Sequence, residues 1–499
     1  MSHTSLKKLT LSALVLMIFT SVYGFANMPR AFFLMGYAAI PWYLIGAIFF
    51  FLPYAFMMAE YGAAFKQEKG GIYSWMEHSV GPKYAFIGTF MWYASYLIWQ
   101  VNVSSSIWIP LSNALFGYDR TGELMLFGLD ATKSLGLLGI LWMIVVTFIS
   151  TKGLNQIQKI TSLGGIAIMC LNVVLFIGGL VIVFLNGGKL AQPVSDFVST
   201  FTVSPNPAYH STFSMFSFLT LAIFAYGGIE VIGGLVDQTV DAEKTFPKGV
   251  SIAALVISIG YAVGIFMVGT FINWYNVLSI PSVNNGNVTY IVMHNLGFEL
   301  AKALGTSESI ALSTGRWLAR FSGLGMFLAL SGAFFTLIYS PLKQLIEGTP
   351  ADLWPKKFSQ LDANHMPTYA MRLQSSAVII LILIVSFGGQ SAAEFFNKLV
   401  IMTSVAMTIP YMFLSAAFPS FKKKEAIIKP FKVYTNDTLS LIASIIVTVT
   451  VGFANLFSIF EPGIIRGAWS DTLLSGGGPL FFVLVALFLY SRYETRLRQ

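Results

Sequence analysis

The chain has 499 residues, of which 56% are apolar and only 10% are charged. Soluble domains carry about 25% charged residues, so the composition excludes a water-soluble protein, and with it most cytosolic enzymes and nucleic-acid-binding proteins. The single cysteine, Cys170, excludes an intramolecular disulfide and a thiolate metal site. These values are typical of a polytopic membrane protein, in which a net charge of +8 is first a signal of membrane topology.

Uncharged stretches mark the predicted membrane spans, because a charged side chain at the bilayer centre costs roughly 2.5–3.5 kcal/mol. Twelve stretches of at least about 18 residues contain no Asp, Glu, Lys or Arg, and each could hold a membrane-crossing helix. Residues 280–286, in the tail of the seventh stretch, have the composition of a loop, which places that span near 249–275. The stretches are 9–29, 31–59, 84–118, 134–151, 160–188, 197–229, 249–298, 321–342, 373–393, 399–421, 438–460 and 472–491.

The distribution of positive charge predicts the topology. Because twelve is an even number, both termini lie on one side of the membrane. With the termini inside, the inner segments hold 21 of the 30 lysine and arginine residues, so the positive-inside rule favours cytoplasmic termini. The longest polar excursions, 118–133, 276–316 and 347–372, are too short for a soluble domain. We therefore expect a single membrane domain over residues 1–499.

Two predicted spans contain clusters of small, polar and helix-breaking residues. The first span includes Tyr23-Gly24-Phe25-Ala26-Asn27-Met28-Pro29, and the sixth reads Phe224-Ala225-Tyr226-Gly227-Gly228-Ile229-Glu230, followed by Gly233-Gly234. The two spans lie five apart, so inverted repeats of five helices would place them at corresponding positions. The alternative is that glycine permits close helix packing, which is how we interpret Gly164-Gly165 and Gly178-Gly179. The combination with aromatic, Asn, Pro and Glu residues favours a pair of broken helices.

A pair of broken helices would have a specific chemistry. An unwound segment exposes N–H groups at the start of the following half-helix, where the helix dipole is positive. It also exposes carbonyl groups at the end of the preceding half-helix. Together these groups could bind a carboxylate and an ammonium a few ångströms apart, which are the head groups of a zwitterionic amino acid.

A few charged residues lie in or near the spans. Glu230 follows the sixth-span break, and two interpretations stay open: a proton or gating role, or a structural acid bonded to exposed backbone. Glu60 ends the second span near the predicted cytoplasmic face, before Lys66, and is interpreted as structural. Arg316 and Arg320, at the outer end of span eight, are expected to snorkel to the membrane surface rather than to attract an anionic substrate.

Aromatic residues follow one or two faces of span three. Their helical spacing favours core packing, and lining of a substrate path is the alternative. The residues are Trp92, Tyr93, Tyr96 and Trp99.

Several motifs are missing from the sequence. There is no phosphate-binding G-x-x-x-x-G-K-[ST] loop, no G-x-S-x-G elbow and no potassium-filter sequence. The five histidines form no i,i+4 pair, so neither a metal nor another cofactor is expected. Secondary transport remains the leading class of function, with a channel or a transporter-like nutrient sensor as alternatives, and we expect no enzyme activity.

Three motifs make the chain resemble the amino acid–polyamine–organocation transporter superfamily along essentially its whole length. The first is the broken first span. The second is Gly70-Gly71-Ile72-Tyr73-Ser74-Trp75, which is similar to that superfamily's G-G-x-Y-x-W loop. The third is the segment 224–247, in which aromatic-x-x-x-G-x-E precedes Asp241-Ala242-Glu243-Lys244-Thr245-Phe246-Pro247 and resembles the span-six signature. Asn27-Met28-Pro29 is similar to the glutamate:GABA antiporter branch.

The resemblance implies an all-α fold of the LeuT type in the bacterial inner membrane. It would comprise a five-helix repeat at 9–188, a second, inverted repeat at 197–421 and two additional helices at 438–491. It also implies alternating access, with the substrate carboxylate on the N–H groups around 24–27 and the amine on carbonyls near 21–23 and 224–226. Phe224 would act as an aromatic lid and Glu230 as the acid linked to gating. The substrate-binding residues would be Ser21, Tyr23, Gly24, Phe25, Ala26, Asn27, Phe224, Ala225, Tyr226, Gly227 and Gly228.

The chain departs from the superfamily pattern at two places. Some proton-coupled relatives carry a lysine in span five, where this chain has Gly164 and Gly165, which argues against proton symport by that route. Only residues 492–499 follow the last predicted span, which argues against a C-terminal plug. We expect a secondary transporter for an amino acid or a related amine, working by exchange or proton coupling. The expected partners are the lipid bilayer and the small-molecule substrate, with a proton as a further candidate and no nucleic acid.

Overall fold

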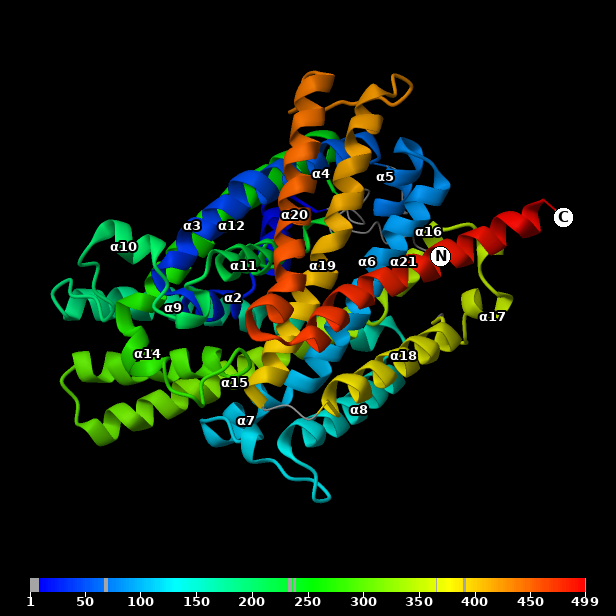
Figure 1. Cartoon of the computed structure of the whole chain (residues 1–499). Coiled ribbons are helices and arrows are strands. Elements are labelled where there is room, and N and C mark those ends of the chain that lie inside the picture. Colours follow the sequence, from blue (N-terminus) through cyan, green and yellow to red (C-terminus); the bar gives the residue numbers. More distant parts are fainter. Residues whose placement is uncertain are drawn as a thin grey trace, which may run out of the picture.

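The computed structural model of the chain describes residues 9–66, 71–231, 236, 239–364, 366–388 and 392–498. Within these residues the chain forms helices joined by turns, without a β-strand (Figure 1). Isolated backbone bridges join Leu9 to Thr239 and Leu126 to Leu129. Gly70, Gly233 and Gly234, which the sequence singled out, lie outside the described residues. An all-α fold is therefore confirmed.

Long helices with short connections make up the molecule. Short 3₁₀ helices cover Gly36–Ala38, Thr121–Glu123, Pro207–Tyr209 and Ala351–Leu353, and a π-helical turn, Ala47–Phe51, joins α3 to α4. The α-helices are α1 (Leu11–Val22), α2 (Asn27–Met35), α3 (Ala39–Gly46), α4 (Leu52–Ala64), α5 (Ile72–Ser79), α6 (Pro82–Ser106), α7 (Trp108–Phe116), α8 (Ala131–Ser150), α9 (Leu154–Leu185), α10 (Phe197–Thr202), α11 (Thr212–Ala225), α12 (Ala242–Phe271), α13 (Trp274–Val277), α14 (Val288–Ala303), α15 (Glu308–Leu337), α16 (Ser340–Gly348), α17 (Lys356–Ser359), α18 (Thr368–Ser386), α19 (Ala392–Lys423), α20 (Asp437–Arg466) and α21 (Trp469–Leu497).

Short polar side chains begin several of these helices. The Asp130 carboxylate accepts the Lys133 N–H at 3.0 Å before α8, and the Ser211 hydroxyl accepts the Ser214 N–H at 3.0 Å before α11. The Asn436 side chain accepts the Leu439 N–H before α20. Each bond satisfies one of the free N–H groups at a helix start.

Ten helical segments within the described residues are long and apolar enough to cross a membrane. Each of the twelve predicted stretches contains a helix. Two features of the structure explain why ten segments, and not twelve, qualify as membrane-crossing helices. The first stretch is divided, because α1 stops after 12 residues at Val22 and α2 continues into α3 and α4 as part of one segment, Asn27–Ala64. The stretch 84–118 contains α6, which has 25 residues, among them Gln100 and Asn102. Helix α6 is not one of the ten candidate membrane-crossing segments.

The polar excursions contain more helix than the sequence predicted. The 276–316 excursion includes α14 and the first turns of α15, which starts at Glu308 instead of 321. Charged residues therefore lie inside helices: Arg316 is an exposed side chain of α15, and Arg320 lies over the Trp317 ring, 5.0 Å from its centroid. Snorkelling of both arginines to the membrane surface stays a prediction. The search for uncharged stretches therefore placed the start of α15 too late in the chain.

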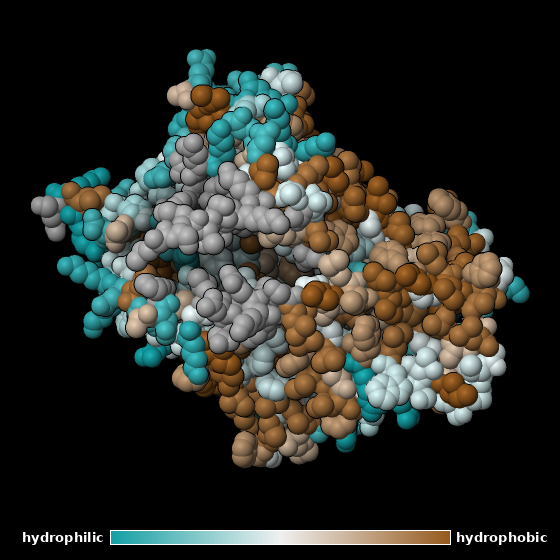
Figure 2. Space-filling model, turned by 180° about the vertical axis from the view of Figure 1, so that it is seen from behind, coloured by the Kyte–Doolittle hydropathy of each residue, from teal (hydrophilic) through white to brown (hydrophobic). Residues whose placement is uncertain are grey.

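A belt of exposed apolar side chains surrounds the bundle. Figure 2 shows a wide hydrophobic expanse bordered by hydrophilic residues. Water-soluble proteins do not expose apolar patches on this scale, so the belt marks the lipid-facing surface of a multi-pass membrane protein. More than two-fifths of each of the following side chains is exposed: Phe148 on α8, Ile166 and Ile177 on α9, Ile259 on α12, Val449 on α20 and Phe481 on α21.

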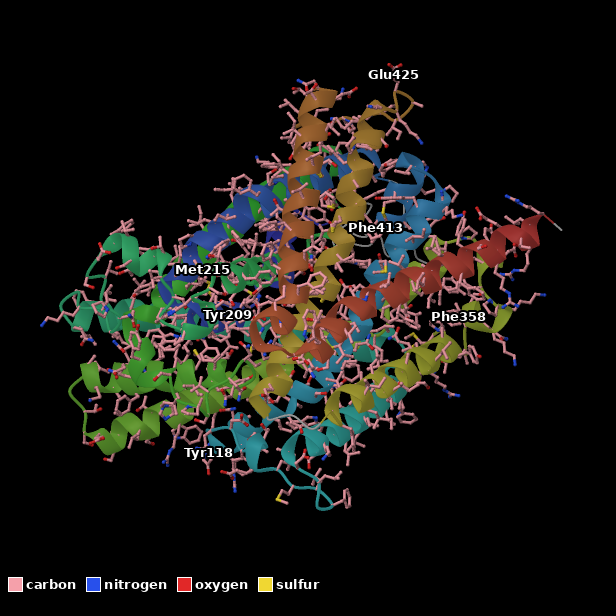
Figure 3. All side chains as sticks on the ribbon, in the orientation of Figure 1. Tyr118, Tyr209, Met215, Phe358, Phe413 and Glu425 are labelled. Atoms are coloured by element: carbon pink, nitrogen blue, oxygen red, sulfur yellow. The ribbon has the colours of Figure 1, made fainter. Side chains whose placement is uncertain are left out.

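The bundle has two ends, which we name after one acidic residue in each. The Glu60 end carries residues 71–81, 349–364 and 424–436, and the Asp119 end carries residues 117–130, 186–211 and 272–287. In Figure 3, Glu425 and Tyr118 lie at these opposite ends.

Glu60 is buried at its end of the bundle. Its carboxylate accepts bonds from Lys422 Nζ at 2.6 Å and from the Val433 and Tyr434 N–H groups at 2.7 and 2.8 Å. These bonds fix the end of α4 to α19 and to the loop that follows it. The contacts support the structural interpretation of Glu60.

Three of the four glycines interpreted as packing sites do allow close helix contact. A Cβ atom on Gly164 would lie 2.8 Å from the Leu328 carbonyl of α15. On Gly178 it would meet Leu296 at 3.1 Å, and on Gly179 it would meet Met267 at 2.6 Å. Gly165 has no atom within 4 Å of that position, so the packing explanation is wrong for this residue.

Candidate functional site

The first membrane helix is broken between α1 and α2. Helix α1 ends at Val22, where the Tyr23 N–H makes a last helical bond to the Phe19 carbonyl at 2.8 Å. Residues 23–26 are not helical, and α2 begins at Asn27. Within the turn the Gly24 N–H points to the Val22 carbonyl at 2.9 Å, and the Asn27 N–H bonds to the Gly24 carbonyl at 3.1 Å. The break falls on the small and polar residues that the sequence indicated.

The second break follows α11. The helix ends at Ala225, residues 226–228 form a turn, and Gly228 has a φ of +107°, which an L side chain rarely adopts. A Cβ atom on Gly227 would lie 2.1 Å from the hydroxyl of Tyr411, and one on Gly228 would lie 3.3 Å from the Ser21 carbonyl. Both glycines are required, because backbone and a neighbouring ring approach them closely. The contact with Ser21 also places the two breaks side by side.

One hydroxyl group joins the two breaks. Tyr261 of α12 is fully buried, and its Oη lies 2.9 Å from the Val22 carbonyl and 2.8 Å from the Ala225 carbonyl. The same oxygen accepts the Gly24 N–H at 2.8 Å and lies 3.3 Å from Asn27 Nδ2. A hydroxyl has one proton and two lone pairs, so the two carbonyls share a single donor. Only one of the two carbonyls can therefore receive this proton at a time, and the Val22 carbonyl also accepts the Gly24 N–H at 2.9 Å.

Buried rings surround this hydroxyl. Tyr23 and Tyr43 lie against Tyr261, with ring centroids 4.6 and 5.3 Å away. Tyr226 packs edge-on to Tyr261 at 5.3 Å and stacks on Phe51 at 4.6 Å. The Tyr23 hydroxyl donates to the Gly260 carbonyl at 2.7 Å, and the Tyr226 hydroxyl donates to the Tyr43 carbonyl at 3.1 Å. The phenol groups of Tyr23 and Tyr226 thus fix the surrounding helices in position.

Glu230 is a buried acid directly after the second break. Its carboxylate accepts the Gly228 N–H at 3.2 Å and the indole N–H of Trp92 at 3.3 Å. Trp92 is buried on α6, as core packing predicts, so one of the span-three aromatics also contacts the break. A carboxylate between an unwound backbone and an indole can respond to movement of either helix. This geometry is compatible with both interpretations of Glu230.

Part of the unwound backbone is reachable by a small molecule. Ser21 is exposed, and Gly24, Gly227, Gly228 and Phe224 are half-buried. The Ser21 hydroxyl itself donates to the Met17 carbonyl at 2.7 Å, so its backbone carbonyl is the group that faces the second break.

The predicted site residues therefore form one cluster with unequal roles. The structure brings together the backbone of Ser21, Gly24, Ala225 and Gly228, and it adds Asn27 through the Tyr261 hydroxyl. The side chains of Phe25 and Ala225 are buried, and Ala26 is half-buried. Tyr261, Tyr411 and Tyr43 were not predicted from the sequence, because their distance from the breaks along the chain leaves no local signal.

A separate cavity of about 250 Å³ lies at the Asp119 end. Its apolar wall includes Phe33 of α2, Phe218 of α11 and Val400 of α19, and its polar groups come mainly from asparagines, from serines and from the end of α20. Phe218 also lies 6.2 Å from the Tyr43 ring, which in turn packs on Tyr261. Ring contacts therefore lead from the cavity to the breaks.

Comparison with known proteins agrees with this geometry. The amino acid permease family model matches residues 9–486. The inner membrane transporter YjeM of Escherichia coli (strain K12) is 52% identical over 99% of this chain and 98% of its own length.

Two proteins of Lactococcus lactis subsp. cremoris (strain MG1363) are more distant. The aspartate/glutamate permease AcaP is 23% identical over 83% of this chain and 79% of its own length. The glutamate/gamma-aminobutyrate antiporter is 23% identical over 73% of this chain and 65% of its own length. These similarities confirm the predicted superfamily and identify a membrane transporter of amino acids instead of an enzyme. The chain belongs to the amino acid permease family of the amino acid–polyamine–organocation superfamily.

Proposed function

We propose that this protein moves an amino acid or a related amine across the bacterial cytoplasmic membrane by alternating access, as an exchanger or a proton-coupled permease. The observation that carries the proposal is the shared hydroxyl of Tyr261, which lies between two carbonyls and an N–H of the two breaks. Membrane helices lose hydrogen bonds in this way only where other groups or a cavity compensate. A substrate that supplies an ammonium and a carboxylate would complete these bonds.

The proposed contacts divide the substrate between the two helix breaks. The N–H groups at residues 24–27 would bind the carboxylate at the start of α2, where the helix dipole is positive. The carbonyls at 21–23 and 224–226 would bind the ammonium, in competition with the Tyr261 proton. Phe224, which is half-buried at the end of α11, would close over the substrate. Glu230 would couple occupancy to helix movement or carry a proton.

Alternating access requires a barrier that opens on one side at a time. The ring contacts from Phe218 through Tyr43 to Tyr261 lie between the cavity at the Asp119 end and the breaks, and we propose that these rings separate when the substrate enters from that end. We also propose inverted repeats at 9–188 and 197–421 with two additional helices at 438–491. The excess of lysine and arginine supports a cytoplasmic Glu60 end and cytoplasmic termini.

The relatives support an amino acid as the substrate. Their names include an aspartate/glutamate permease, a glutamate/gamma-aminobutyrate antiporter and, at 20% identity, a probable agmatine/putrescine antiporter. The YjeM proteins are inner membrane transporters, which supports the same location here.

Counterflow in proteoliposomes tests the proposal. Purified protein is reconstituted, the vesicles are loaded with one unlabelled amino acid or diamine, and entry of the same labelled compound is followed. We expect transient accumulation of at least one amino acid, saturating with concentration. A channel would give a flux that does not depend on the loaded compound. Absence of exchange above protein-free vesicles for all amino acids and diamines would contradict the proposal.

A further inference from the structure

We propose that the cavity at the Asp119 end is a second binding site for a zwitterionic amino acid, in which Glu461 binds the ammonium and Arg466 binds the carboxylate. The inference rests on the proposed function, because it assigns this cavity to the same class of substrate. The proposed second site differs from the site at the breaks because it uses α20, one of the two helices outside the predicted repeats. The site at the breaks therefore does not already imply this second site.

The cavity has walls that suit a small molecule with charged head groups. Its apolar surface is lined by Phe33, Leu34, Phe218, Leu221, Val400 and Ile401. Glu461 and Arg466 lie in the last turns of α20 and line it as well. In Figure 3, Tyr209, another lining residue, lies close to this end of α20. A mostly apolar cavity with a few convergent polar groups is the usual form of a small-molecule site.

The two charges are only loosely bound to protein groups. Glu461 Oε2 lies 3.5 Å from Arg466 Nη2, and its Oε1 lies 3.5 Å from the Ser214 hydroxyl. Charge-assisted bonds are normally about 2.7–2.9 Å long, so both contacts are weak. The Glu461 side chain is 13% exposed and that of Arg466 is 37% exposed. A half-buried acid with such long contacts can still accept an ammonium, and the exposed guanidinium can still donate to a carboxylate.

A third group in the cavity lacks a partner. The Asn285 side chain is 5% exposed, and its Oδ1 is buried without a hydrogen bond among the described residues. Its Nδ2 donates to Asn397 Oδ1 at 3.0 Å, and its backbone carbonyl accepts Arg30 Nη2 at 3.2 Å, so Asn285 is held at two points. An unsatisfied buried acceptor costs free energy. A ligand N–H at this position would remove that cost.

The cavity also lies on the route to the breaks. Ser217 and Leu221 of α11 line it, and the same face of α11 reaches Phe224 about one turn further on. On α19, Ser404 lines it, and Tyr411, two turns further on, lies against Gly227. An amino acid held in the cavity would therefore be positioned for transfer when the rings between the two sites separate.

Binding stoichiometry and chemical selectivity test the proposal together. Equilibrium dialysis of the purified full-length protein with labelled L-glutamine and L-glutamate should give two bound molecules per chain. The Glu461→Gln and Arg466→Gln variants should each bind one molecule per chain, or bind the second molecule with an affinity at least about tenfold lower. A tenfold lower affinity corresponds to the loss of one charge-assisted contact. Lys83→Gln is the control, because it breaks a different ion pair, with Glu494 at 3.2 Å, at the opposite end of the bundle.

Head-group analogues separate recognition from a structural role of the pair. In the native protein neither N-acetyl-L-glutamine, which has no ammonium, nor L-glutamine methyl ester, which has no carboxylate, should compete for the second site. Glu461→Gln should improve the relative binding of the N-acetyl compound, and Arg466→Gln that of the methyl ester. If the ion pair were merely structural, each variant would be less stable, but the order in which these analogues bind would not change.

Two outcomes would overturn the inference. One is a single bound molecule per chain in the native protein. The other is that stoichiometry and analogue order in the two variants match those of Lys83→Gln. If the native protein exchanges amino acids in proteoliposomes and either result is found, only the second site is wrong. If no amino acid exchanges, the proposed function fails first.

Discussion

Replacement of Tyr261 by phenylalanine removes the one hydroxyl that joins the two helix breaks while keeping the ring. Its oxygen lies within 3.3 Å of two N–H donors and two carbonyls, but with one proton and two lone pairs it makes at most three hydrogen bonds at a time. Side-chain hydrogen bonds in membrane and soluble proteins contribute about 0.6–1.5 kcal/mol each. We therefore expect Tyr261→Phe to lower the free energy of unfolding by about 2–4 kcal/mol.

Loss of the Tyr261 hydroxyl should slow transport more than loss of a tyrosine hydroxyl that makes a single hydrogen bond elsewhere. Tyr84→Phe is the matched control, because the Tyr84 hydroxyl makes a single bond, to the Phe413 carbonyl at 2.6 Å, on α6 away from the breaks. Thermal unfolding in detergent and exchange in proteoliposomes are measured for both variants. We expect Tyr261→Phe to reduce exchange at least about tenfold, equivalent to 1.4 kcal/mol, and Tyr84→Phe to leave it nearly unchanged. Equal stability and equal exchange rates in the two variants would refute the reasoning.

Three further changes test separate parts of the structure. Gly227→Ala should place a methyl group 2.1 Å from the Tyr411 hydroxyl, with an overpacking cost of about 1–3 kcal/mol and loss of exchange in the proteoliposome assay. Glu230→Gln should keep the fold but abolish the pH dependence of exchange, measured as initial rates across a pH series. Lys422→Met leaves the Glu60 carboxylate buried without its ion-pair partner, so we expect a loss of roughly 3–5 kcal/mol and a lower yield of folded protein in size-exclusion chromatography.

Each of these changes has its own control. Gly165→Ala meets no atom within 4 Å and should be silent; if it is as harmful as Gly227→Ala, the close approach of Tyr411 is not the cause. A Glu230→Gln variant with native rates at every pH would assign the acid a purely structural role. Adding Glu60→Gln to Lys422→Met should recover part of the yield, because the uncompensated charge is then removed. No recovery would show that packing, not charge, dominates at this position.

Periodic and compositional features of the sequence were sufficient to predict the helical spans and both breaks. Residues 23–26 and 226–228 are unwound where glycine and asparagine occur among aromatic residues. The contacts that organise the site could not be predicted. Tyr261 reaches Val22 across 239 positions of the chain, and only the packing of α12 against α1 and α11 determines which of many buried tyrosines takes that place.

Charged residues inside helices account for most of the errors in span boundaries. The uncharged-stretch criterion assumes that a charge near the membrane has no partner. Lys398 lies within α19 because its ammonium pairs with Asp471 of α21 at 2.8 Å, and both side chains are largely buried. Partners of this kind become visible only when the helices are placed in space.

Alternating access, as proposed, requires that the breaks open to the cytoplasm and to the outer side of the membrane in turn. Because Cys170 is the single cysteine, a Cys170→Ser background permits site-directed labelling. Ser21→Cys and Ser217→Cys are introduced separately and treated with a membrane-impermeant maleimide in right-side-out and inverted vesicles. We predict that position 217 reacts only from the outer side and that position 21 reacts from either side, because the breaks open to the two sides in turn. The transported amino acid should change the rates of labelling of position 21 from the two sides in opposite directions. Labelling of position 21 from one side alone, or a parallel change of its two rates on addition of the amino acid, would contradict alternating access.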